Sequence, residues 1–137
     1  MQSLFTDCPH RERLGWQEQL HLMGAAIQYN YNILTLGKKI TADIRAEQNV
    51  NGLVPSTVPE YTEMHFAGGY FRDSPEWGSN VILFPWSLYQ WYGDKEELMN
   101  NYAAMQKYVD NVNTLSIIGN KSNIPYLPSQ NNIAEGK

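Results

Sequence analysis

The sequence predicts an all-α fold built from helical hairpins. Apolar residues recur at helical spacing in four successive segments, and these segments alternate between helices that are apolar nearly all round and helices that are amphipathic. A helix that is apolar nearly all round is buried on more than one side, whereas an amphipathic helix turns one face to water. This order predicts hairpins arranged in two concentric layers, as in an α/α toroid or a solenoid.

Length and composition are those of one globular domain and exclude several other classes. The 137 residues are 42% hydrophobic and 18% charged, and 10 Lys+Arg stand against 14 Asp+Glu, for a net charge of −4. The acidic balance argues against nucleic acid as the main partner, and no apolar run approaches the roughly 18–20 residues of a membrane span. One cysteine, Cys8, excludes an internal disulfide, and the isolated His10, His21 and His65 do not make a metal site, so we expect no cofactor.

The first two helices are expected over residues 17–34 and 35–48. The first carries two apolar stripes, which begin at Leu20 and Leu22, so it is expected to be buried on more than one side. The second has one narrow apolar stripe, marked by Ile40, and charged residues around the rest of its surface. It is therefore expected to be an outer helix.

A long ordered loop is expected between the two hairpins, over residues 49–73. It contains Asn51-Gly52, two prolines and Gly68-Gly69, each of which signals a turn, and it also holds four aromatic residues. Loops longer than about 12–15 residues in compact domains are usually functional or disordered. The aromatic residues favour a functional loop.

The third and fourth helices have clear start signals. Ser74 is a good N-cap before a third helix that runs to Gly93, with a kink expected at Pro85. Asp94 opens a sequence that resembles a capping box, and the fourth helix is expected to run to about Leu115. Residues 116–137 are expected to form an irregular tail.

The hairpin pattern predicts that more chain completes the fold. Two hairpins cannot close a ring, and such repeats generally need three or more units before the core is covered. The first and third helices would each keep an uncovered apolar flank. No signal peptide is visible, and the chain opens almost directly on its most chemically dense segment, which looks like a start inside a larger protein, so the compartment stays open.

That dense segment is the strongest candidate for chemistry. Between Asp7 and Trp16 it places two carboxylates and two guanidiniums beside a tryptophan. An arginine next to Glu12 lowers the pKa of that carboxyl group, so a general acid here would need desolvation to outweigh the arginines. The alternative is a charged loop whose ion pairs fasten the first helix, since surface ion pairs are common and mostly weak.

The sequence of this segment, Thr-Asp-Cys-Pro-His-Arg-Glu-Arg-Leu-Gly-Trp, closely resembles the signature motif of bacterial α-L-rhamnosidases of glycoside hydrolase family 78. Further motifs at residues 43–48, 51–55, 77–79 and 85–94 recur in the same order, and the resemblance covers residues 4–113. It implies that residues 1–115 are the N-terminal part of an (α/α)6 toroidal catalytic domain, here about two hairpins and the aromatic-rich loop. It also implies inverting hydrolysis of terminal α-L-rhamnosides.

The resemblance also implies residue roles. Glu12 matches the general acid, Asp7 and Arg11 match residues of the sugar site, and Trp16 and Trp77 match aromatic walls of that site. The implied partners are rhamnose-containing glycosides or polysaccharides and the remainder of the catalytic domain. No position of this chain matches the general base, so we expect the chain alone to be inactive.

Two departures from the family pattern remove carboxylates from the sugar site. Gln19 and Ser79 stand where many members have an acidic residue, and the nearby acids that could substitute are Glu18, Asp73 and Glu76. With the missing base, these departures keep two alternatives open. The chain could be a carbohydrate-binding remnant without turnover, or a purely structural helical fragment.

Overall fold

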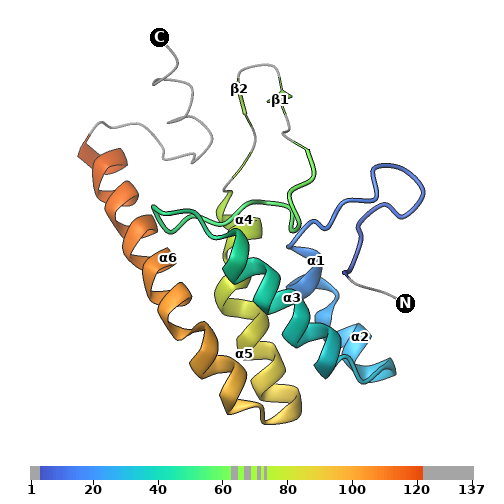
Figure 1. Ribbon diagram of the computed structural model, residues 1–137. Helices are drawn as coiled ribbons and strands as arrows, with labels where there is room; N and C mark the ends of the chain where they lie inside the picture. Colours follow the sequence, from blue (N-terminus) through green and yellow to red (C-terminus); the bar gives the residue numbers. More distant parts are fainter. Residues whose placement is uncertain (1–3, 63–64, 67–68, 71, 73, 122–137) are drawn as a thin grey trace.

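The computed structural model describes residues 4–62, 65–66, 69–70, 72 and 74–121. This part of the chain is helical apart from one short antiparallel β-hairpin (Figure 1). The longer helices are α3 (Leu34–Glu47), α5 (Asn80–Tyr92) and α6 (Lys95–Lys121). The predicted all-α fold of helical hairpins is confirmed.

The segment expected to form the first helix is divided in two. The structure has α1 (Gln19–Leu22) and α2 (Gly24–Asn30), with a break at Met23. Tyr31 is extended, with φ −141° and ψ 142°, so α2 ends before the expected residue 34. Asn32 Oδ1 accepts a hydrogen bond from the N–H of Leu34, the first residue of α3, at 3.1 Å. Apolar periodicity carries through both interruptions, which is why the prediction of one helix over residues 17–34 is wrong.

The second hairpin shows the same kind of difference. A short α4 (Pro75–Gly78) precedes α5, and the break falls at Ser79, whereas one helix was predicted from Ser74 onward. Gly93 ends α5 with φ +70°, as expected for a glycine C-cap. Asp94 accepts a hydrogen bond from the Glu97 N–H at 3.0 Å, which confirms the cap of α6.

The bounds of the remaining elements differ less. Helix α3 lies within a residue of the expected range 35–48. Helix α6 continues to Lys121, beyond the expected end near Leu115, and residues 122–137 of the predicted tail lie outside the described residues. The predicted long loop contains the strands β1 (His65–Phe66) and β2 (Gly69–Tyr70), which are too short to show a strand pattern.

Helix α5 is the centre of the core. Its Phe84 and Leu88 are fully buried, and they pack with Ile40 and Ile44 of α3 and with other buried apolar side chains from α1 and α6. Gly37 of α3 allows this close packing, since a Cβ built there would lie 2.6 Å from Leu88 Cδ2.

Polar contacts show that the two hairpins run in the same direction. Three pairs join residues 21–33 of the first hairpin to α5, the first long helix of the second, at a constant separation of 59 residues: His21 with Asn80, Gln28 with Ser87, and Ile33 N–H with the Tyr92 hydroxyl. Two pairs join α3 to α6 at a separation of 56 residues: Thr41 with Glu97, and Gln48 with the Ala104 carbonyl. Like helices of the two hairpins are therefore parallel, which is the geometry of a hairpin repeat.

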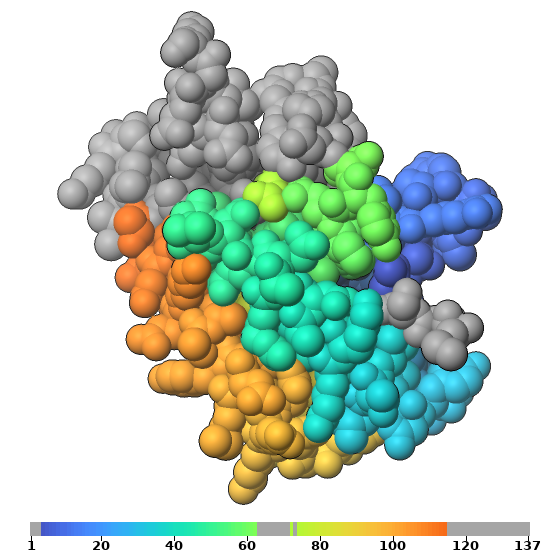
Figure 2. Space-filling view, in the orientation of Figure 1, coloured from blue at the N-terminus to red at the C-terminus, as the bar shows by residue number. Residues whose placement is uncertain are grey.

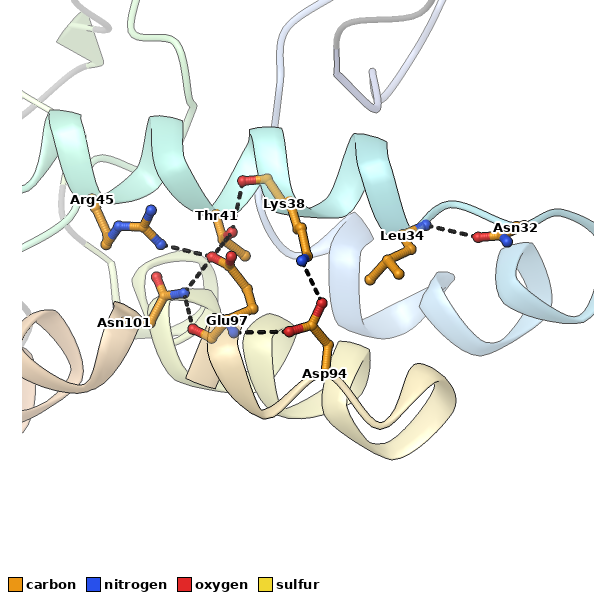
Figure 3. A network of polar contacts seen from close by, with 8 residues as sticks. All are labelled: Asn32, Leu34, Lys38, Thr41, Arg45, Asp94, Glu97 and Asn101. Atoms are coloured by element: carbon orange, nitrogen blue, oxygen red, sulfur yellow. Dashed lines mark hydrogen bonds and ion pairs between the residues drawn. The ribbon is translucent and has the colours of Figure 1, made fainter. Parts of the chain in front are cut away.

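One of these pairs belongs to a buried charge network between α3 and α6 (Figure 3). The Glu97 side chain is 5% exposed and accepts hydrogen bonds from Thr41 Oγ1, from Arg45 Nη1 at 2.7 Å and from Asn101 Nδ2 at 2.7 Å. Lys38 Nζ lies 2.6 Å from Asp94 Oδ2 at the start of α6. This network fixes the register of the two outer helices.

The uncovered apolar flanks expected for an incomplete ring are present in the structure. Leu22 is 65% exposed and Tyr29 80% exposed in the first hairpin, and Leu83 and Trp86 are exposed on α5. Among the described helices, none is both long enough and apolar enough to cross a membrane. The apolar surface of the described part thus faces outward from two adjacent helices.

The irregular segments gather at one end of the helices. Figure 1 shows the N-terminal loop, the loop after α3, the β-hairpin and α4 at the same end of the bundle. In the space-filling view the N-terminal segment adjoins the loop around residue 60 at this end (Figure 2). Every predicted site residue that the structure describes comes from these segments or from the helix starts beside them.

Candidate functional site

The N-terminal loop is fixed to the loop after α3 by backbone contacts. The Val58 N–H donates to the Gly15 carbonyl at 3.0 Å, and the Gln17 N–H donates to the Ser56 carbonyl at 3.1 Å. Trp16 forms an isolated antiparallel bridge with Thr57 between these bonds. Gly15 is required here, because a Cβ built on it would lie 2.3 Å from the Val58 carbonyl oxygen.

The loop itself is closed by hydrogen bonds around Cys8. The Cys8 carbonyl accepts from the Arg11 N–H at 3.0 Å and from the Arg13 N–H at 3.4 Å, and the Cys8 N–H donates to Asp7 Oδ1 at 2.9 Å. Cys8 and Arg13 have φ values of 46° and 57°, in the left-handed region that non-glycine residues rarely adopt. These turns bring Asp7 back beside Glu12.

The result is a compact cluster of polar side chains. A carboxylate oxygen of Asp7, the Cys8 sulfur and a carboxylate oxygen of Glu12 all lie within 4.8 Å of one another. Arg11 donates from Nε to Glu12 Oε2 at 2.8 Å, and its Nη2 lies 3.8 Å from Cys8 Sγ. The Arg11 guanidinium thus offsets the charge of one of the two carboxylates.

The electrostatics of Glu12 follow from this contact. The hydrogen bond from Arg11 is the main reason that the pKa of Glu12 is lowered to about 2. A hydrogen bond with Glu12 in turn raises the pKa of the Cys8 thiol. Glu12 is therefore ionised at neutral pH in the described structure, as the sequence predicted for a carboxylate beside an arginine.

Glu18 lies in the opposite environment at the start of α1. Burial raises the pKa of Glu18, and the negative charge of Asp7 adds to the increase. Its Oε2 atom is buried and has no hydrogen-bond partner. Two carboxyl groups six positions apart in the sequence thus have pKa values moved in opposite directions.

The two predicted aromatic walls lie together. The rings of Trp16 and Trp77 have centroids 5.7 Å apart and are tilted by 52°. Both side chains are half-buried. This pair joins the N-terminal loop to α4 and presents aromatic surface at the end of the bundle that carries Asp7 and Glu12.

Glu76, another proposed substitute for the missing carboxylates, does not join this cluster. Glu76 is exposed and accepts a hydrogen bond from Ser74 Oγ, which lowers its pKa, so it acts on the start of α4. Asp73 lies outside the described residues. His10 is exposed, and the ring of His21 contacts Asn80, with 2.9 Å between His21 Nδ1 and Asn80 Nδ2.

One set of side-chain contacts at this end of the bundle, centred on Arg72, was not predicted. Arg72 Nε donates to both carboxylate oxygens of Glu60, at 2.8 and 2.9 Å, and Arg72 Nη1 donates to Asn49 Oδ1 at 2.9 Å. These bonds join the two ends of the long loop beneath the β-hairpin. An acid twelve positions before an arginine has no local spacing signal, so sequence patterns do not identify the pair.

Comparison with known proteins gives a consistent result. The family model described as the bacterial alpha-L-rhamnosidase 6 hairpin glycosidase domain matches residues 1–123. An α-L-rhamnosidase of Formosa agariphila is 31% identical over 105 residues, which are 76% of this chain and 11% of that protein. An α-L-rhamnosidase of Streptomyces avermitilis is 30% identical over 108 residues, which are 78% of this chain and 10% of that protein.

Solved structures show the same architecture. The α-L-rhamnosidase from Dictyoglumus thermophilum superposes with a TM-score of 0.76 at 32% identity, covering 85% of this chain and 13% of that one. The S. avermitilis α-L-rhamnosidase complexed with L-rhamnose superposes with a TM-score of 0.74 at 24% identity, covering 82% of this chain and 10% of that one, and supports the fold. The chain spans about a tenth of the length of the curated relatives that it matches.

Proposed function

The chain belongs to the family of bacterial α-L-rhamnosidases with a six-hairpin glycosidase domain, and from this premise we propose that it forms the part of a catalytic domain that carries the general acid. The supporting observation is the closed loop of residues 7–14, which places the Asp7 and Glu12 carboxylates within 4.8 Å of each other at the end of the bundle. The Trp16–Trp77 pair lies at the same end and suits the apolar face and methyl group of a rhamnose ring.

In this proposal the reaction is hydrolysis with inversion. An inverting glycosidase needs one carboxylic acid to protonate the leaving oxygen and a second carboxylate to activate water on the opposite face of the sugar. Glu12 supplies the acid, and Asp7 holds sugar hydroxyl groups. The base comes from hairpins outside this chain. Residues 1–115 are thus the N-terminal part of the catalytic domain, and the remaining hairpins cover its exposed apolar flanks.

Glu12 must gain a proton before it can act as an acid. Its pKa of about 2 is set mainly by Arg11, and the two side chains are 27% and 75% exposed. Water exclusion raises the pKa of a carboxyl group, and a guanidinium that turns to a sugar oxygen no longer stabilises the carboxylate. Substrate binding and the remaining hairpins therefore activate Glu12 together.

The binding part of the proposal can be tested on the 137-residue chain. Rhamnose should change its tryptophan fluorescence, and Trp16→Ala should remove this response. The control is Trp91→Ala, because Trp91 lies at the opposite end of α5, where its ring packs edge-to-face with Tyr29 at a centroid distance of 4.7 Å. An equal response in both variants would contradict the assignment of Trp16.

The catalytic part has two tests. The chain alone should release no rhamnose from an aryl α-L-rhamnoside, because it holds no base, and measurable release would contradict this. In a whole catalytic domain that carries this segment, Glu12→Gln should abolish release while rhamnose binding persists. Full activity of that variant would exclude Glu12 as the acid.

The alternative is a carbohydrate-binding remnant without turnover. The observation that favours it is the ionised state of Glu12, which suits hydrogen bonding to sugar hydroxyl groups and opposes proton donation. Rhamnose binding with no hydrolysis in the whole domain would establish this alternative.

A further inference from the structure

The carboxyl group of Glu18 is the one acidic group at this end of the described structure with a buried oxygen that has no hydrogen-bond partner. Glu18 Oε2 is shielded from solvent and has no hydrogen-bond partner, although the carboxyl group as a whole interacts with the Gln19 side chain and with its own backbone. By contrast, Glu12 is bonded to Arg11, Glu60 to Arg72 and Glu76 to Ser74. A buried polar atom without a partner is destabilising, and in a native protein it calls for an explanation such as a catalytic role or a bound partner.

The position of Glu18 relates it to the proposed sugar site. It is the N-cap residue of α1 and stands two positions after Trp16, whose ring packs with Trp77. The charge of Asp7 acts on it from the N-terminal loop, and Gln19 and His21 act on it from its own helix. Its side chain makes no cap hydrogen bond to the backbone of α1.

We propose that Glu18 binds a hydroxyl group of the bound glycoside through Oε2, which supplies the partner that the protein itself does not. This inference rests on the proposed function, since it assigns a further contact in the same sugar site. A sugar hydroxyl both donates and accepts hydrogen bonds, so it satisfies this oxygen in either protonation state of Glu18. Glu18 thereby replaces a carboxylate that is missing at Gln19 or Ser79.

The test compares Glu18→Gln and Glu18→Met with the wild-type chain and with Glu96→Met. Glu96 is an exposed acid in the first turn of α6 and serves as the matched control. Rhamnose affinity is measured by tryptophan fluorescence, and thermal midpoints are measured by circular dichroism. We expect Glu18→Met to weaken rhamnose binding about tenfold or more, and Glu96→Met to leave it unchanged.

The thermal midpoint separates a binding role from a structural one. Because Oε2 has no partner in the protein, Glu18→Gln, which keeps the size and the hydrogen-bonding atoms of the side chain, should keep the midpoint of the wild-type chain. A clear decrease would show that the carboxyl group stabilises the fold and would overturn the inference, whatever the binding result. Unchanged rhamnose affinity in both Glu18 variants would overturn the inference alone, whereas no response of the wild-type chain to rhamnose would overturn it together with the proposed sugar site.

Discussion

Replacement of Arg45 by methionine tests how the two outer helices are held together. The Arg45 guanidinium lies 2.7 Å from Glu97 Oε1, and their side chains are 27% and 5% exposed. Methionine keeps much of the length and apolar contact of the arginine stem but removes the charge. We expect this substitution to lower the free energy of unfolding, because it leaves a buried carboxylate without its counter-ion.

The magnitude follows from the partners that remain. Removing one member of a buried ion pair costs about 3–5 kcal/mol, and a hydrogen bond to a charged group contributes about 1.5–3 kcal/mol. Thr41 and Asn101 still donate to Glu97, and Arg45 is partly exposed, so we expect a loss of about 2–3 kcal/mol. The control is Lys39→Met on the same helix, which breaks an exposed i,i+4 pair with Asp43 and should cost about 0.3–0.5 kcal/mol.

The loss should also depend on pH. Burial alone would raise the pKa of Glu97, but the hydrogen bonds from Thr41, Arg45 and Asn101 outweigh it, and the pKa is lowered. A lowered carboxyl pKa contributes stability above the unfolded value of about 4.3, and this contribution is lost as the pH falls through the folded value. The difference between wild type and Arg45→Met should therefore be constant near neutral pH and shrink below about pH 4.

Urea unfolding followed by circular dichroism at several pH values measures both effects. A loss no larger than that of Lys39→Met would show that the network contributes little to stability. A loss of the expected size that persists unchanged into acid would refute the ion-pair explanation and would assign the effect to packing of the arginine stem.

Three further substitutions test the loop and the helix ends. Gly15→Ala should lower the free energy of unfolding by about 2–3 kcal/mol, because the new Cβ would meet the Val58 carbonyl. The control Gly24→Ala has open space around it and should leave stability unchanged or raise it by about 0.5 kcal/mol. Equal unfolding midpoints in denaturant for the two variants would contradict the close contact at Gly15. Gly93→Ala places a side chain at φ +70° and should lower the free energy of unfolding by about 1–2 kcal/mol in the same assay. An unchanged free energy of unfolding would mean that α5 ends in another conformation. Arg11→Leu should raise the pKa of Glu12 toward the ordinary glutamate value, as carboxyl NMR titration would show, and an unchanged titration would mean that Arg11 does not set it.

Local signals were enough to predict much of this fold. The range of α3, the glycine end of α5 and the aspartate cap of α6 each depend on neighbouring residues, and each is confirmed within a residue or so. The breaks at Met23 and Ser79 were missed, because the apolar spacing continues across them while the backbone does not. Hydrophobic periodicity reports which face is buried and carries little information on local backbone turns.

Tertiary contacts set the limits of the site prediction. The sequence predicted that Arg11 would lower the pKa of Glu12, because the two residues are adjacent. The Arg72–Glu60 fork and the unsatisfied oxygen of Glu18 depend on how separate segments meet, and no spacing in the sequence reports them. The family resemblance assigned both Trp16 and Trp77 to the sugar site, but the contact between their rings was not predicted, since sixty positions of chain lie between them.

The exposed apolar flanks and the ionised state of Glu12 have one explanation in the proposed catalytic domain. Leu83 and Trp86 are exposed on α5, and Glu12 and Arg11 are open to water at the end of the same bundle. Further hairpins that bury the flanks would also exclude water from the loop, and desolvation raises the pKa of a carboxyl group while it strengthens hydrogen bonds to the sugar. The acid would thus become competent only when the ring around it is closed. In this proposal the same closure would also bring the base opposite Glu12, so that neither carboxyl group would act on a glycoside before the ring is complete.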